Sequence, residues 1–142
     1  MTMSEQLRNI MSAEADLMDA LTETLAGTQQ ALLGADGDAL VEYTRREESL
    51  LRPFHDLEYE RERCVREIAG PERSMTDLLA AVPEDEREPL ESLAKRMRTA
   101  ARRIVDLNGQ NRTLIHNAQR FVQETIRIIT DDHRRKLVDE RM

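Results

Sequence analysis

The chain has 142 residues and a net charge of −7, with 35% charged, 39% hydrophobic and only 3% aromatic residues. An acidic protein with few side chains for base stacking is repelled by a phosphate backbone, so we expect no nucleic-acid binding. The longest purely apolar run covers residues 78–82, whereas a membrane-spanning helix needs roughly 20 residues, so we expect no membrane insertion.

The cysteine content and the first ten residues indicate the cellular compartment of the protein. Cys64 is the one cysteine and cannot form an intrachain disulfide, and residues 1–10 lack the basic and apolar regions of a signal peptide. We therefore expect a cytoplasmic protein.

The first predicted helix covers residues 3–33. Thr2 and Glu5 have the spacing of a capping box, and the glycine-rich run 34–38 ends the pattern. Between them, core-facing positions recur every three or four residues: Leu7, Met11, Glu14, Met18, Leu21, Leu25, Thr28 and Leu32. Met11 and Met18 either pack in the core or belong to an adaptable surface for helical partners.

A second helix is predicted over residues 37–69, capped by Asp36 or Asp38 and ended by Gly70. Pro53 lies inside it and removes one backbone hydrogen bond, so we expect a kink or a break near residues 49–53. The apolar stripe stays in register across the proline, which favours a kink.

Two more helices are predicted after Gly70. Ser74 and Asp77 begin a short helix over 75–82, and an acidic stretch after Pro83 begins a long helix over 84–130. Gly109 is the weak point of the long helix, which can be straight or bent there. The charged residues 131–142 are expected to fray.

These elements predict an all-α, single-domain chain: an elongated antiparallel bundle of three long helices with a short connecting helix and coiled-coil-like packing. At about 1.5 Å per residue, the last helix outruns the first two.

No catalytic constellation can be assembled. A di-iron bundle needs Glu three residues before His, and Arg or Thr stands there before His55, His116 and His133. We therefore expect no enzymatic activity, no metal and no cofactor; the enzymatic alternative is a metal-binding bundle that uses His55 and His116. Cys64 lies on an apolar stripe, which favours a buried structural thiol over a nucleophile.

Five cations stand within nine residues of the long helix, without an acidic residue among them. They are expected to form a solvated face that pairs with the acidic helices, and a phosphate site is the alternative. They are Lys95, Arg96, Arg98, Arg102 and Arg103.

The segment 121–129 carries two apolar rows where one bundle seam needs one. Phe121 continues the core stripe, together with Thr125 and Ile128. The second row consists of Val122, Ile126 and Ile129. Both rows are either buried, against the first two helices or in a dimer, or exposed as a face for an amphipathic partner helix.

Asn111 is a polar residue at a core position of the same long helix. It either fixes the register among the long helices, as a buried asparagine does in coiled coils, or faces solvent beside Gly109.

Three segments resemble the FlgN family of flagellar export chaperones. They are the acidic helix and Gly/Asp turn at 17–40, the helix at 46–68 with Leu50-Leu51, Leu57-Glu58 and Arg61, and the segment 107–129. The last carries an Asn-x-x-Asn-x-x-Leu-Ile motif: Asn108, Asn111, Leu114 and Ile115.

The resemblance implies an all-α chaperone without ATPase activity. Such a protein binds the C-terminal helical region of the hook–filament junction subunits FlgK and FlgL, prevents their premature association, and delivers them to the export gate component FlhA. In the family the C-terminal region binds the client, and the resemblance implies that the matching residues here are Phe121, Val122, Ile126 and Ile129. The alternative is a homodimeric coiled-coil scaffold, in which the second row is a self-interface.

Overall fold

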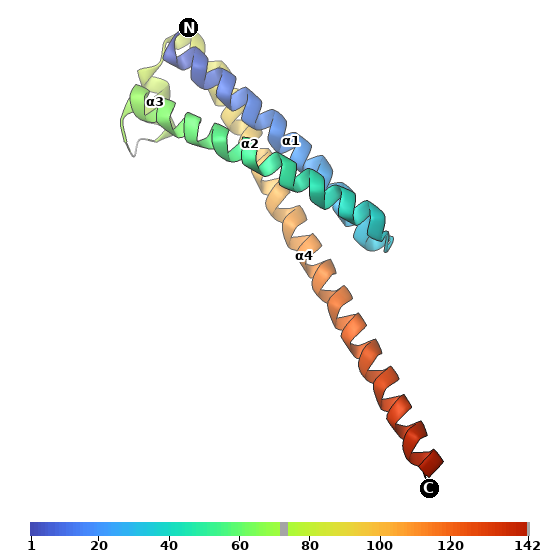
Figure 1. Ribbon diagram of the computed structural model, residues 1–142. Coiled ribbons are helices and arrows are strands. Elements are labelled where there is room, and N and C mark those ends of the chain that lie inside the picture. The colour runs from blue at the N-terminus through green and yellow to red at the C-terminus, as the bar shows by residue number, and fades with distance from the viewer. Residues whose placement is uncertain (72–73, 142) are drawn as a thin grey trace.

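The computed structural model describes residues 1–71 and 74–141, which form four helices (Figure 1). These are α1 (Met3–Leu33), α2 (Gly37–Ala69), α3 (Met75–Ala81) and α4 (Glu84–Arg141). No strand occurs in the described part of the chain. The predicted fold class, three long helices packed with a short connecting one, is confirmed.

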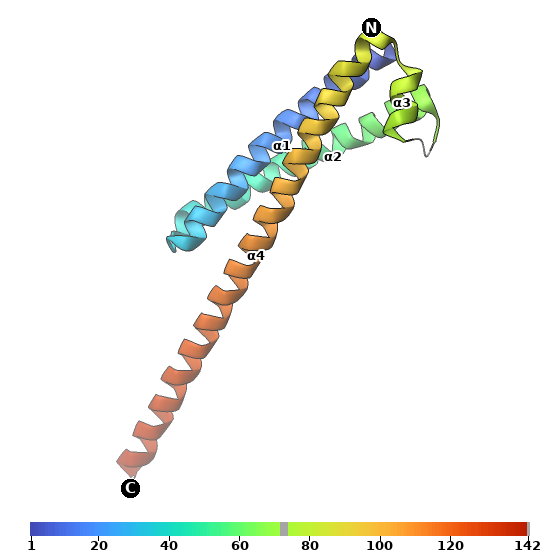
Figure 2. The ribbon, with the colours of Figure 1, turned by 180° about the vertical axis from the view of Figure 1, so that it is seen from behind.

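The helix α1 lies between the other two long helices. It packs closely against both α2 and α4, whereas the backbones of α2 and α4 do not approach each other closely over the described residues. Figures 1 and 2 show α2 antiparallel to α1, and α4 starting near the N-terminus and running in the direction of α1. The up-down-up order follows from the short turn after α1 and the short α3 before α4.

Local sequence signals place the helix starts. The Thr2 hydroxyl accepts from the Glu5 amide while the Glu5 carboxylate accepts from the Thr2 amide, which is the predicted capping box. Asp36 caps α2 by accepting from the amide of Ala39, and Ser74 forms a second capping box with Asp77. Each cap satisfies an amide that has no partner inside its helix.

The hydrophobic core is concentrated near the start of α1, where all four helices meet. Its buried members are Leu7, Met11, Cys64, Leu78, Val82, Leu90 and Ala94. Burial raises the pKa of the Cys64 thiol, which keeps it protonated and inert, as the structural interpretation requires. Farther along, the core narrows to the seam between α1 and α4.

Pro53 does not interrupt α2, which runs through it as one helix. The stripe on both sides of the proline therefore belongs to one element. The helix is only loosely covered: Cys64 is its one buried residue, and the rest of its stripe is half-buried or exposed.

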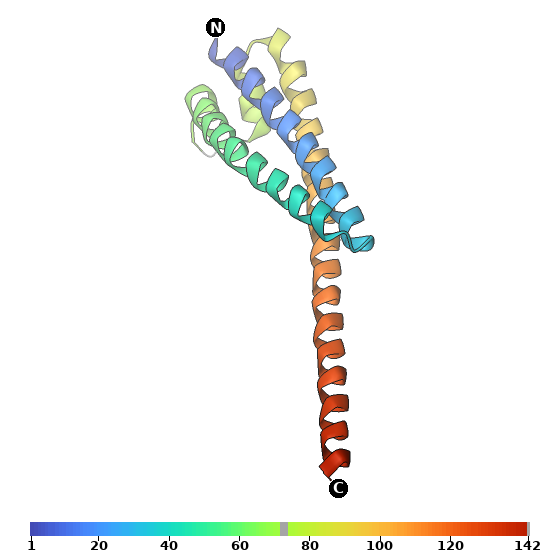
Figure 3. The same ribbon diagram turned by 45° about the vertical axis from the view of Figure 1, so that its right-hand side comes forward.

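The helix α4 differs from the prediction at its C-terminal end. It continues to Arg141 instead of ending at 130, so residues 131–141 are helical in the structure, and their fraying stays a prediction; residue 142 lies outside the described residues. The segment contains no Gly or Pro, and Asp131 and Arg135 stand at the i,i+4 spacing of a favourable charge pair. The helix runs through Gly109 as one element, and the second half of α4 extends past the α1–α2 turn (Figures 1 and 3).

Candidate helix-binding surface

Both apolar rows of the segment 121–129 are exposed. The exposed fraction is 70% for Phe121, 53% for Val122, 58% for Ile126 and 63% for Ile129. Ile128 is 65% exposed. Isolated exposed apolar residues are common in proteins, but two contiguous rows on one helix indicate an interaction surface.

The architecture explains this exposure. The α1–α2 hairpin ends at residues 33–37, whereas α4 continues for many more turns (Figure 3). Over the described residues, α4 packs closely only against α1 and α3. The alternative in which both rows pack against the first two helices of the same chain is therefore wrong.

A groove lies where α4 leaves the hairpin. It has a volume of about 540 Å³ and is lined by Leu32 of α1, Leu40 of α2 and, from α4, Ile115, Ala118, Gln119, Val122 and Gln123. Val122 belongs to the second row, so the row and the groove form one continuous surface. We call this surface, from Ile115 to Ile129, the α4 face.

The Asn-x-x-Asn motif lies at the inner end of the α4 face. Asn111 is buried, and its Nδ2 donates to the carbonyl oxygen of Leu25 in α1 over 3.0 Å. This contact supports the register interpretation and contradicts the solvent-facing one. Asn108 and Ile115 are exposed, and Leu114 is half-buried.

Met11 and Met18 are not part of the α4 face. Both are buried, so their packing in the core is the interpretation that the structure supports. They line a hollow of about 290 Å³ between α2 and α4, together with Met75 and Met97. The structure therefore separates these two residues from Phe121 and Val122.

A buried ion pair joins α1 to α2. Glu14 is fully buried, and Nε of Arg61 lies 2.8 Å from its Oε1. Burial raises the pKa of the Glu14 carboxyl, and the charge of Arg61 offsets part of that rise. The sequence analysis placed Glu14 at a core-facing position and named Arg61 only in the family resemblance, so it did not predict this pair.

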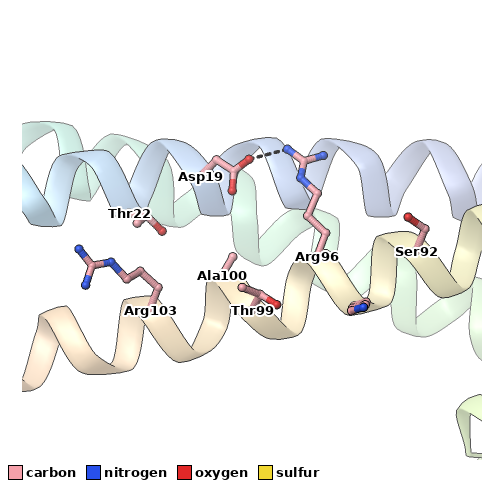
Figure 4. A pocket seen from close by; sticks show the side chains of 8 residues that line it. Asp19, Thr22, Ser92, Arg96, Thr99, Ala100 and Arg103 are labelled. Atoms are coloured by element: carbon pink, nitrogen blue, oxygen red, sulfur yellow. Dashed lines mark hydrogen bonds and ion pairs between the residues drawn. The ribbon is translucent and has the colours of Figure 1, made fainter.

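The basic cluster of α4 borders a polar groove against α1 (Figure 4). Figure 4 shows Arg96 reaching from α4 to Asp19 on α1, and Arg96 also pairs with Asp16 at 3.0 Å. These pairs agree with the predicted solvated face that pairs with an acidic helix. All four of the other cations are exposed.

Residues 1–71 and 74–141 contain no cluster of three or more His, Cys, Asp or Glu side chains that could hold a metal ion. Within the same ranges, none of the helices has a stretch long and apolar enough to span a membrane. The described features point to contacts with another protein.

The model of the FlgN protein family matches residues 1–137. The chain belongs to the FlgN family. No curated protein and no solved structure matches it. FlgN proteins are non-enzymatic flagellar export chaperones for hook-associated proteins, so the surface that matters here is one that binds a protein client.

Proposed function

We propose that this chain binds the C-terminal helical region of FlgK- or FlgL-like hook–filament junction subunits through its α4 face. The observation that carries the proposal is the doubled apolar row on a helix segment that no other described helix covers; its members are Phe121, Val122, Ile126 and Ile129. An unassembled helical client exposes apolar surface of its own. A complementary helix face covers that surface without nucleotide hydrolysis.

In this proposal the chaperone works in the cytoplasm. It keeps the junction subunits from associating early and delivers them to the export gate component FlhA. The family membership and the geometry of the α4 face support a binding role, and release follows from competition for the client helix.

The test compares folded variants of the α4 face. Val122→Asp and Ile126→Asp place a carboxylate in the apolar contact, and we expect each to weaken binding of a FlgK- or FlgL-like C-terminal fragment at least about a hundredfold, because the charge must be desolvated. Isothermal titration calorimetry measures the affinity, and circular dichroism checks that helix content is unchanged. Val105→Asp is the matched control, because Val105 is an exposed apolar residue of α4 outside the α4 face. Unchanged affinity in the folded Val122 and Ile126 variants would remove the proposed site.

A homodimeric scaffold is the competing function, because two copies of the α4 face could cover each other. Sedimentation velocity at micromolar concentration, with and without the client fragment, separates the two. The chaperone proposal predicts a one-to-one complex at the expense of any self-association, whereas a stable dimer that ignores the client contradicts it.

A further inference from the structure

Asn111 carries a buried hydrogen-bond acceptor that the described part of the chain does not use. The side chain is 4% exposed, and its nitrogen is committed to the Leu25 carbonyl oxygen, which can only accept. Its Oδ1 is buried and has no hydrogen-bond partner among residues 1–71 and 74–141. Buried polar atoms are nearly always paired, so this orphaned oxygen requires an explanation.

The orphaned oxygen belongs to a residue that lines a pocket between the three long helices. The pocket has a volume of about 240 Å³, and its polar lining comes from Thr28 of α1, Glu47 of α2, and Asn108, Asn111 and Arg112 of α4. The space exceeds the roughly 30 Å³ that one water occupies in the liquid, so it admits the head of a side chain.

Glu47 supplies a second acceptor in the pocket. Its Oε1 accepts from the Thr28 hydroxyl over 2.7 Å, which holds the carboxylate in place. Glu47 forms no ion pair within the described ranges, and the neighbouring Arg112 is exposed. Within the described ranges the carboxylate charge is therefore not engaged in an ion pair, although Arg112 also lines the pocket.

The pocket lies at the inner end of the α4 face. Ile115 lines both the pocket and the apolar groove, and Val122 lines the groove and belongs to the second row. Asn111, Ile115, Ala118 and Val122 follow one another at spacings of four, three and four residues, which places them on one side of α4. From Asn111 to Ile129 this side is about 27 Å long, at about 1.5 Å per residue.

We propose that this pocket receives the cationic head of an arginine or lysine side chain at one end of the client helix. The inference rests on the proposed function, because the client lies along the α4 face. A guanidinium or ammonium group carries several N–H donors and a positive charge, which match the free amide oxygen of Asn111 and the carboxylate of Glu47. An acidic side chain would face Glu47 with like charge, and an apolar one would leave Oδ1 unpaired.

A double-mutant cycle tests the pocket. Glu47→Gln removes the charge while keeping an acceptor for Thr28, and each Arg or Lys of a FlgK- or FlgL-like C-terminal fragment is changed in turn to Gln. Calorimetry should show that Glu47→Gln and one client substitution each weaken binding about tenfold, and that the pair weakens it no further than either alone. Glu48→Gln is the matched control, because Glu48 is the exposed next residue of α2.

Two outcomes overturn the inference: an effect of Glu47→Gln no larger than that of Glu48→Gln, or additive losses for every client cation. The first outcome would leave water as the occupant of the pocket. Val122→Asp, measured in the same experiment, distinguishes a failure of the pocket inference from a failure of the proposed client site. If that variant loses binding while Glu47→Gln does not, the pocket is wrong and the client site stands; if Val122→Asp binds normally, the client site itself is wrong.

Discussion

Glu14 places a buried ionisable group in the interface between α1 and α2. Its carboxylate has Arg61 as an ion-pair partner, and burial raises its pKa despite that positive charge. The folded state therefore binds the Glu14 proton more tightly than the unfolded state does. This group's contribution to the free energy of unfolding falls as pH rises from about 4.5 through the raised folded pKa.

Removing Arg61 should expose this dependence. Arg61→Met leaves Glu14 buried without its cation, so we expect a loss of about 3 kcal/mol in the free energy of unfolding near pH 7.5 and a clearly smaller loss near pH 5, where more of Glu14 is protonated. Urea unfolding at both pH values measures the difference. Arg63→Met, an exposed position on the same helix, is the control and should lose little at either pH. An equal loss at both pH values for Arg61→Met would contradict the burial of a charged Glu14.

At the scale of elements, the α1–α2 turn contains an unexpected strain. The left-handed position in this turn is taken by Ala35, with φ of 51°, and not by the neighbouring Gly34, whose φ is −89°. A residue with a Cβ pays roughly 1–2 kcal/mol in that conformation.

Ala35→Gly should relieve the strain. The gain is reduced by roughly 0.5–1 kcal/mol for the greater freedom of glycine in the unfolded chain, which leaves a net stabilisation of about 0.5 kcal/mol. Ala80→Gly is the control, because Ala80 is exposed inside α3 and should lose about 1 kcal/mol. Urea unfolding of both variants measures the sign of each change in the free energy of unfolding. Destabilisation by Ala35→Gly would show that the turn carries no strain.

Periodicity and capping chemistry predicted where the helices start, because those signals lie within a few residues of each other. Three features escaped them. The left-handed backbone of Ala35 has no signal in the sequence. The pairing of Glu14 with Arg61 joins positions 47 residues apart. The helix beyond residue 130 depends on the absence of helix-breaking residues rather than on an apolar stripe. The doubled row at 121–129 was visible in the sequence, but its exposure depends on how far the hairpin reaches along α4.

At the scale of the whole molecule, α1 is the central helix, and α4 is a packed helix in its first half and a free one in its second (Figures 1 and 2). An isolated helix in water is marginal even when its sequence favours helix. The free half of α4 therefore gains most of its stability only when a partner covers the α4 face.

Amide hydrogen exchange, with and without a FlgK- or FlgL-like C-terminal fragment, tests this account most directly. Without the fragment, amides beyond about residue 118 should exchange far faster than those of the α1–α4 seam, because the side chains of that part of the helix are exposed. In the complex, residues 115–129 should become strongly protected, with the α1–α4 seam unchanged. Protection that appears only in α1 and α2, or no change along the α4 face, would contradict the claim that the free half of α4 binds the client.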